Sequence, residues 1–326
     1  MIEVKNLVKK YGDHLAVDGL NFTIEPGRIY GFLGPNGAGK STTMNMITGY
    51  IASTEGDVII NGHNILEEPE EAKKCIGYLP EQPPLYFDMT VLEYLKFAAE
   101  LKKIPKQDRE KMLEEVMDLV KISDVKDRLI KNLSKGYRQR VGLAQAVLGY
   151  PEVIILDEPT VGLDPKQIIE IRDLIKNLGD KHTVILSSHI LSEVSAICDY
   201  VLIISHGKLV ASDTTENLEK MTMASNELNL TVKTTQDKLK NILSSISGIE
   251  EISCLASEED GAVDIKIKTS EKTDIREDLF YKLAEHRCPL LKMEFNRLSL
   301  EDIFLELTDD SSENIKEEEQ EDAGDL

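Results

Sequence analysis

The sequence of 326 residues contains no tryptophan, few cysteines and no long apolar run. The four cysteines are scattered along the chain, at Cys75, Cys198, Cys254 and Cys288. Since they include no CxxC pair, they indicate reduced thiols and argue against a disulfide framework. The longest apolar runs, Val153–Leu156 and Val201–Ile204, have the length of buried strands and fall far short of the roughly 18–20 residues of a membrane-spanning helix.

Two further absences concern metals and secretion. The six histidines show no HExxH or similar spacing, so the sequence predicts no histidine metal cage. No apolar signal segment follows the first residues, Met1–Lys5, and secretion is therefore not expected. Together these features predict a cytoplasmic protein.

Charge of one sign dominates the sequence. With 59 acidic residues against 38 basic ones, the formal net charge is −21. An acidic surface repels phosphate backbones, so nucleic acid is not an expected partner. Residues 309–326 hold nine of the acidic residues against a single lysine, Lys316, and few apolar side chains. We expect this segment to be a disordered acidic tail.

The apolar pattern of residues 1–215 predicts an α/β domain. Ile2, Val4 and Leu7 alternate with polar residues, which is typical of half-buried antiparallel strands. Short apolar segments with the character of buried strands alternate with helical segments further on. The strands are expected at Arg28–Leu33, Val153–Leu156 and Thr183–Ser187, and the helices at Lys40–Ile47 and Gln167–Leu178. This alternation predicts a doubly wound sheet.

Two regions depart from that alternation. Residues of about 85–150 show helical periodicity alone, most clearly in Val91–Leu101 and Asp108–Val120, and predict an inserted helical subdomain. After a polar linker at 216–225, residues 226–308 predict a second, small α+β domain. Its elements are expected at Glu227–Lys233, Gln236–Ser245, Ile249–Ala256, Ala262–Thr269, Thr273–His286, Leu290–Asn296 and Leu300–Thr308. The first six follow the ferredoxin-like order of strand, helix, strand, strand, helix, strand.

A glycine-rich loop follows the strand at Arg28–Leu33. The segment Gly34-Pro35-Asn36-Gly37-Ala38-Gly39-Lys40-Ser41 matches GxxxxGK(S/T) without a gap. Glycines allow the backbone N–H groups of such a loop to converge on phosphates, and the following helix presents its positive end to them. Lys40 is expected to reach the β- and γ-phosphates of a nucleotide, and the Ser41 hydroxyl to bind Mg²⁺.

The strand Val153–Leu156 ends in two carboxylates, Asp157 and Glu158. Beside a phosphate-binding loop, Asp157 is placed to hold Mg²⁺, directly or through water, and Glu158 to polarise an attacking water. Phosphoryl transfer needs positioning and charge compensation more than covalent help, and these residues supply both.

Between these two motifs lies Leu133-Ser134-Lys135-Gly136-Tyr137-Arg138-Gln139-Arg140, with Ser134 in a helix-capping position. This segment resembles the LSGGQ signature of the ABC ATPases. The order of the motifs resembles that family over about residues 1–215. The resemblance implies a P-loop NTPase core with a mixed sheet, an antiparallel N-terminal β subdomain and an inserted helical subdomain.

The resemblance also implies roles for further residues. Asp164 lies in a segment similar to the D-loop, and His189 resembles the switch histidine that contacts the γ-phosphate. Tyr11 stands where the family stacks an aromatic ring on adenine, with Val17 packing nearby. The implied ATP-binding set is Tyr11, Val17, Gly34, Pro35, Asn36, Gly37, Ala38, Gly39, Lys40, Ser41 and Thr42, together with Ser134 and Gly136 of a second module paired head to tail.

Two segments depart from the family pattern. The signature has Lys135 instead of its first glycine and Tyr137 instead of glutamine, a variation that resembles the ABC-2 type exporter subunits. In the segment similar to the Q-loop, the glutamine position falls on Glu81, and Gln82 is the next residue. Either could contact Mg²⁺ or the attacking water, so the sequence leaves this role open between Glu81 and Gln82.

The function implied by the resemblance is ATP hydrolysis that drives transport through a separate transmembrane permease. The run Ser299–Leu307 resembles the C-terminal extensions of ABC-2 exporter subunits of the drug and antibiotic branch, so export is favoured. The partners expected are an ABC-2 permease and a second ATPase copy or a paralogue, which places the chain at the cytoplasmic face of a membrane. A soluble ATPase acting on the ribosome is the alternative. It is disfavoured because the chain has one set of motifs and an acidic charge.

Overall fold

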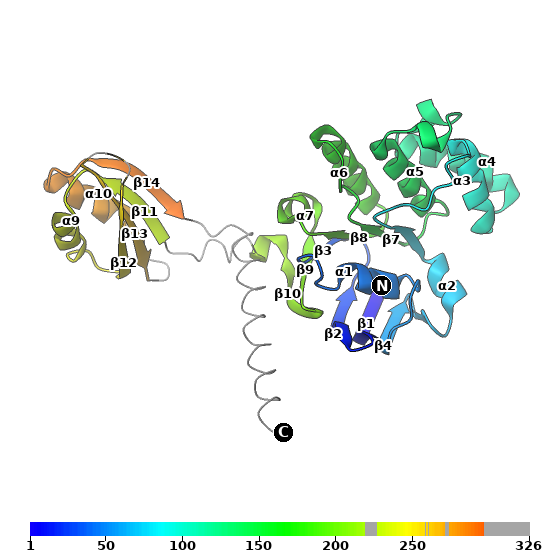
Figure 1. The fold of residues 1–326 in the computed structure, drawn as a ribbon, viewed down its shortest axis with the longest axis horizontal. Helices are drawn as coiled ribbons and strands as arrows, with labels where there is room; N and C mark the ends of the chain where they lie inside the picture. Colours follow the sequence, from blue (N-terminus) through cyan, green and yellow to red (C-terminus); the bar gives the residue numbers. More distant parts are fainter. Residues whose placement is uncertain (219–226, 258, 260, 271–273, 297–326) are drawn as a thin grey trace, which may run out of the picture. The chain divides into compact units, whose positions relative to one another are not determined.

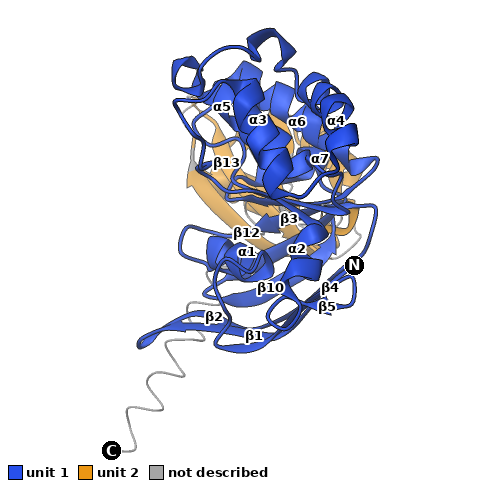
Figure 2. Cartoon of the chain, turned by 90° about the vertical axis from the view of Figure 1, so that its right-hand side faces the viewer, with its two compact units in different colours: residues 1–215, 306–326 blue, residues 216–305 orange. Residues whose placement is uncertain are grey.

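The computed structural model describes residues 1–218, 227–257, 259, 261–270 and 274–296. These residues fall into two compact units, which divide after Thr215 (Figure 2). We call them unit 1 and unit 2. Most of the expected linker, the expected helix at Leu300–Thr308 and the acidic tail lie outside the described residues. No helix within the described ranges is both long and apolar enough to cross a membrane.

The main sheet of unit 1 has six strands. They are β3 (Ile29–Leu33), β6 (Ile76–Leu79), β7 (Val153–Asp157), β8 (Thr183–Ser188), β9 (Tyr200–Ser205) and β10 (Lys208–Thr214). Their order is β10-β9-β3-β8-β7-β6, and only β10 runs antiparallel to its neighbour. Every residue of β3, β7 and β8 is buried, which explains the apolar runs within these strands. The carboxyl ends of these strands meet at one edge of the sheet.

A second sheet of unit 1 is antiparallel. It consists of β1 (Ile2–Tyr11), β2 (His14–Ile24), β4 (Glu55–Ile60) and β5 (His63–Asn64), in the order β2-β1-β4-β5. Helix α1 (Lys40–Ile47) lies between the two sheets, where Met44 and Ile47 join a core that both sheets share (Figure 1). Helices α6 (Pro165–Gly179) and α7 (Leu191–Ile197) cover the opposite face of the main sheet.

The remaining helices of unit 1 form the expected helical subdomain. Apart from α2 (Pro69–Lys74), they are α3 (Val91–Leu101), α4 (Lys106–Leu119) and α5 (Lys135–Val147), joined by single 3-10 turns at Ser123–Val125 and Ile130–Asn132. Helix α3 begins with a capping box in which the side chains of Thr90 and Glu93 bond each other's backbone N–H. Helix α4 begins two residues before the expected Asp108, directly after Pro105 at φ −55°, a value that leads into a helix without strain.

Unit 2 contains β11 (Glu227–Val232), α9 (Gln236–Leu243), β12 (Ile249–Ala256), β13 (Val263–Thr269), α10 (Arg276–Glu285) and β14 (Leu290–Asn296). The strands form an antiparallel sheet in the order β12-β13-β11-β14. Counted within the unit this order is 2-3-1-4, so the ferredoxin-like prediction is confirmed. Leucine and isoleucine side chains of α9 and α10 pack on one face of the sheet, against Leu228, Leu230 and Ile267.

Candidate nucleotide-binding site

The glycine-rich loop joins β3 to α1 and folds around the side chain of Lys40. The Lys40 ammonium donates hydrogen bonds to the carbonyl oxygens of Gly34 at 2.8 Å and Pro35 at 3.2 Å, and only 5% of the residue is exposed. Gly39 precedes α1 with φ +100°, and a Cβ there would lie 2.6 Å from the Ala16 carbonyl oxygen. Only glycine fits this position without strain or a clash.

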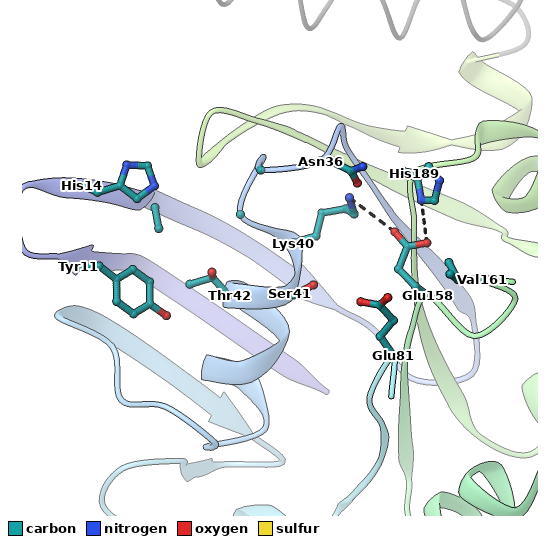
Figure 3. Close-up of a pocket in the computed structure, with 13 residues that line it drawn as sticks. Tyr11, His14, Asn36, Lys40, Ser41, Thr42, Glu81, Glu158, Val161 and His189 are labelled. Carbon is teal, nitrogen blue, oxygen red and sulfur yellow. Dashed lines mark hydrogen bonds and ion pairs between the residues drawn. The ribbon is translucent and has the colours of Figure 1, made fainter. Parts of the chain in front are cut away.

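A cavity of about 450 Å³ opens over this loop (Figure 3). Its lining joins the antiparallel hairpin, the glycine-rich loop, the start of α1 and the carboxyl ends of the main sheet. The lining residues are Tyr11, His14, Ala16, Asn36, Gly37, Gly39, Lys40, Ser41, Thr42, Glu81, Glu158, Val161 and His189. Tyr11 and His14 stand at one end, and Lys40, Glu158 and His189 converge at the other.

The Glu158 carboxylate lies between two nitrogen groups. The Lys40 ammonium is 3.7 Å from one carboxylate oxygen, and His189 Nδ1 is 2.9 Å from the other. Only 9% of the Glu158 side chain is exposed, whereas 39% of the His189 side chain is. The carboxylate is therefore held in a fixed orientation and faces the cavity with little access to bulk water.

The backbone of Glu158 adopts a conformation that non-glycine residues rarely use. Its φ is +46°, in the left-handed region. Its N–H donates to the carbonyl oxygen of Ser187 at 3.2 Å and to the Ser187 hydroxyl at 3.1 Å, so the end of β8 holds this turn in place. Strained residues of this kind cluster at functional sites, where the surrounding structure holds them.

Asp157 occupies the last position of β7 and is buried, with 3% exposure. It accepts a hydrogen bond from the Ser187 hydroxyl, and the Ser41 hydroxyl lies 3.5 Å from its carboxylate. A hydroxyl that lines the cavity thus lies close to a carboxylate oxygen just behind the lining. No cluster of three or more histidine, cysteine, aspartate or glutamate side chains with metal-binding geometry occurs among the described residues.

Burial determines the protonation behaviour of the groups around Lys40. Loss of water contact lowers the pKa of the Lys40 ammonium, an effect that the nearby Glu158 and Asp157 carboxylates partly oppose. Burial also raises the pKa of the Tyr78 hydroxyl, and the Asp157 carboxylate adds to that shift. A polyanion in the cavity would favour the charged form of Lys40 and so restore its ordinary behaviour.

The structure separates the two candidates for the Q-loop role. Glu81 lines the cavity, below Glu158 in Figure 3, and Gln82 is not among the lining residues. Val17 and Ala38 do not line the cavity either, because both are buried in the core that supports the loop. The half-exposed ring of Tyr11 does line it.

The signature residues lie apart from this cavity. Ser134 and Gly136 stand at the start of α5, and neither is a lining residue. The Ser134 hydroxyl caps α5 by accepting from the Tyr137 N–H at 3.4 Å, as the sequence predicts. Asp164 likewise caps α6 by accepting from the Gln167 N–H at 2.9 Å.

Small residues bring the starts of α5 and α6 together. A Cβ on Gly136 would lie 2.7 Å from the Gln167 side chain. The ammonium of Lys135 lies 2.2 Å from where a Cβ on Gly162 would stand. The unusual signature residue Lys135 therefore packs over the D-loop glycine of its own chain.

Three cavity residues were not singled out from the sequence: His14, Ala16 and Val161. His14 and Tyr11 form a cross-strand pair at the end of the β1–β2 hairpin. The Gly12-Asp13 turn between them is a signal that could have placed His14 opposite Tyr11.

The comparisons with known proteins agree with this geometry. The family described as ABC transporter matches residues 17–161. The ABC transporter ATP-binding protein YhcH of Bacillus subtilis is 36% identical over 97% of this chain and 98% of its own length. The chain belongs to the ABC transporter family. It is an ATP-binding subunit with ATPase activity that powers transport, and no finding supports the ribosome alternative.

Other members of the ABC transporter family match about two thirds of the chain. The bacitracin transport ATP-binding protein BcrA of Bacillus licheniformis is 41% identical over 68% of this chain and 72% of its own. The lantibiotic transport ATP-binding protein SrtF of Streptococcus pyogenes is 35% identical over 68% of this chain and 95% of its own. A dimeric ATP-binding cassette, MJ0796, in a post-hydrolysis state with ADP and Pi, superimposes with a TM-score of 0.60, at 27% identity over 66% of this chain and 99% of its own.

Proposed function

We propose that this chain is the ATPase subunit of an exporter and that the cavity over the glycine-rich loop is its ATP site. The observation that carries the proposal is the convergence of Lys40, Glu158 and His189 at one end of that cavity. The substrate would place its adenine beside Tyr11 and its phosphates along the loop, where backbone N–H groups and the start of α1 face them.

Lys40 compensates the charge of the β- and γ-phosphates. Its ammonium lies 3.7 Å from the Glu158 carboxylate, and phosphate oxygens would add further opposite charge around its buried position. Glu158 then orients the attacking water as general base, and His189 contacts the γ-phosphate while its Nδ1 holds the Glu158 carboxylate.

Mg²⁺ would bind beside Ser41, which lines the cavity. Ser41 and Asp157 would hold it, since their oxygens lie 3.5 Å apart and Mg²⁺ prefers few protein oxygens completed by phosphates and water. The ion supplies charge neutralisation to the phosphates when bound. Glu81, which lines the cavity, is the better candidate than Gln82 for the Q-loop contact with Mg²⁺ or the attacking water.

The distance between the signature and the cavity implies a second module. Ser134 and Gly136 do not line the cavity of their own chain, so they would close over the γ-phosphate bound by a partner in a head-to-tail pair. The partner is a second copy or a paralogue, and Asp164 would communicate between the two sites. The dimeric cassette among the similar structures supports this arrangement.

A groove of the helical subdomain provides a docking surface for a membrane permease. It has a volume of about 260 Å³ and is lined mainly by Pro84, Tyr86, Tyr94, Phe97, Ala98 and Leu101. Tyr86 and Leu101 are 54% and 67% exposed, and Tyr86 contacts the ring of Phe97, so the groove presents neighbouring apolar side chains of the kind that interaction sites use. Pro84 of the groove follows Glu81 by three residues. A short segment therefore connects the groove to the ATP site, and binding in the groove would influence Glu81 through it.

The names of two relatives support a proposal for the direction and the location of transport. BcrA and SrtF are named for bacitracin and lantibiotic transport. We infer that this chain also powers export, through an ABC-2 type permease, and that it lies at the cytoplasmic face of the membrane through that permease.

The catalytic proposal is tested by ATP hydrolysis at increasing chain concentration, with and without Mg²⁺. Turnover per chain should rise with concentration, because each site needs two modules, and should vanish with EDTA. Glu158→Gln should bind ATP, lose turnover by about 10²–10³-fold and accumulate as an ATP-bound dimer. Glu152→Gln, at a carboxylate outside the cavity, is the control. Equal turnover in wild type and Glu158→Gln would refute the assignment of the general base.

The docking proposal is tested by co-expression with the candidate permease. Tyr86→Glu should abolish co-purification and stimulated ATP turnover while basal turnover of the isolated chain stays unchanged. Phe280→Glu is the matched control, since Phe280 is 55% exposed but belongs to unit 2. Loss of permease binding in Phe280→Glu alone would place the docking surface elsewhere.

A further inference from the structure

A buried carboxylate behind the ATP site has no part in the chemistry described above. Glu193 lies on α7 with 4% exposure, and it is not among the cavity-lining residues. A buried carboxylate is costly unless charge and hydrogen bonds compensate it. Its partners therefore indicate what the position serves.

The Glu193 carboxylate makes two hydrogen bonds and one ion pair, each with a different segment of the chain. Its Oε2 accepts a hydrogen bond from the Thr160 hydroxyl at 2.6 Å and from the Ser188 hydroxyl at 3.3 Å. Its Oε1 lies 3.5 Å from the guanidinium of Arg172 on α6. Thr160 and Ser188 are themselves buried, with 6% and 1% exposure, so neither hydroxyl has water as a ready substitute.

The two hydroxyls belong to the turns that carry Glu158 and His189. Thr160 follows Glu158 by two residues, and Ser188 directly precedes His189. The Ser188 hydroxyl also accepts from the Ile190 N–H at 3.0 Å. This hydrogen bond closes a short turn that contains His189. One carboxylate oxygen of Glu193 thus ties the Glu158 turn to the His189 turn.

The Glu158 turn needs such support because its backbone is strained. Ser187 holds the amino side of the left-handed Glu158 through its N–H. Thr160, anchored on Glu193, holds the chain on the carboxyl side. Without that anchor the turn could relax toward an unstrained conformation and draw the Glu158 carboxylate away from His189 Nδ1.

We propose that Glu193 is a positioning residue for ATP hydrolysis, which keeps the turns of Glu158 and His189 at the separation where their side chains meet. The Arg172 guanidinium lies 3.5 Å from the other oxygen of Glu193 and supplies an opposite charge to the carboxylate that accepts from both hydroxyls. The inference rests on the proposed role of Glu158 and adds a residue that does not line the cavity.

The test compares Glu193→Gln, Thr160→Val and the double variant in the full chain. We expect each single variant to lower kcat by about tenfold, the equivalent of about 1.4 kcal/mol in the barrier. KM should change little, and ATP affinity measured in a Glu158→Gln background should stay unchanged. The double variant should lose no more than the worse single variant, because both changes cut the same link.

Two further variants separate positioning from stability. Ile175→Val, in the core of α6, should lower the melting temperature modestly and leave kcat unchanged at 25 °C. Arg172→Met combined with Glu193→Gln should recover part of the lost kcat, because it removes the unpaired cation that Glu193→Gln leaves behind.

The outcomes distinguish this inference from the proposed function. Turnover by Glu158→Gln equal to wild type would remove the proposed function itself. If Glu158→Gln is inactive but Glu193→Gln keeps full kcat, or loses kcat only in proportion to a loss of stability, Glu193 is not a positioning residue. Additive losses in Glu193→Gln and Thr160→Val would likewise overturn the link between the two turns.

Discussion

The two units of this chain bury different kinds of side chain. Unit 1 buries Lys40, Arg140, Asp157, Glu158 and Glu193 together with serine and threonine hydroxyls. Among the described residues of unit 2, the buried side chains are apolar except for Thr269. Buried charges are retained at a cost, whereas an apolar core needs no compensation. The difference locates the chemistry in unit 1 and gives unit 2 a core that serves its own folding.

The relatives support the same division. The match to SrtF extends over 225 residues and 95% of that relative, which is close to the length of unit 1. The match to YhcH extends over 319 residues. Family members thus occur in both sizes, and we infer that unit 2 adds to an ATPase that unit 1 already contains.

The comparison is tested most strongly by removing one buried cation from unit 1. We expect Lys40→Met to lower kcat/KM for ATP by about 10²–10³-fold, because a buried phosphate contact is lost and Glu158 loses a partner. Lys266→Met on the exposed side of β13 in unit 2 is the control and should leave kcat/KM unchanged. Steady-state ATPase assays measure both, and equal losses would erase the contrast between the units.

A cavity in the core of unit 2 should affect stability and spare catalysis. Leu230→Ala removes a buried side chain of β11 and should cost about 2–5 kcal/mol in the free energy of unfolding of unit 2. Denaturant unfolding followed by circular dichroism should then show an early transition, while ATP turnover at 25 °C persists. Loss of turnover in step with that transition would show that unit 1 depends on unit 2.

A substitution at Gly162, in the segment similar to the D-loop, tests how unit 1 connects the signature segment to helix α6. Gly162→Ala should slow turnover by about tenfold, because the added Cβ displaces Lys135 and the residue has φ +70°. Gly27→Ala is the matched control, since Gly27 has φ +77° but open space for a Cβ. Comparable kcat values for the two variants would show that backbone strain alone causes the loss and that the contact with Lys135 has no effect.

An effect of similar size, confined to ATP binding, is expected at the adenine end. Tyr11→Ala should raise KM for ATP by about tenfold with little change in kcat, because stacking of a base on an aromatic ring contributes about 1–3 kcal/mol. Tyr11→Phe keeps the ring and should retain the wild-type KM. An unchanged KM in Tyr11→Ala would place the base elsewhere in the cavity.

Much of the fold could be predicted because its signals are local. The bounds of α1 and α3 agree with the expectation, since a glycine loop and a capping threonine mark where they begin. The strand order of unit 2 follows from its alternation of elements. The sequence pattern predicts no element at β4, β5 or α2, because these elements are short and lack a strong apolar period.

The site was harder to predict where it depends on tertiary contacts. Glu81 and Gln82 are adjacent in an irregular segment, and only the folded chain distinguishes the one that faces the cavity. Glu193 lies 33 residues from Thr160, so no motif spacing connects the two. The roles of the motif residues remain predictions that rest on the family and on the geometry.

The central claim is that one chain holds half of each ATP site, and mixing two defective variants tests it most directly. Lys40→Met disables the phosphate loop, and Ser134→Arg disables the signature. Each variant alone should be inactive. Their equimolar mixture should regain up to about a quarter of wild-type turnover, because half of randomly formed pairs contain one intact site of two. A mixture that stays inactive although the two chains pair, or full turnover by Ser134→Arg alone, would contradict the account.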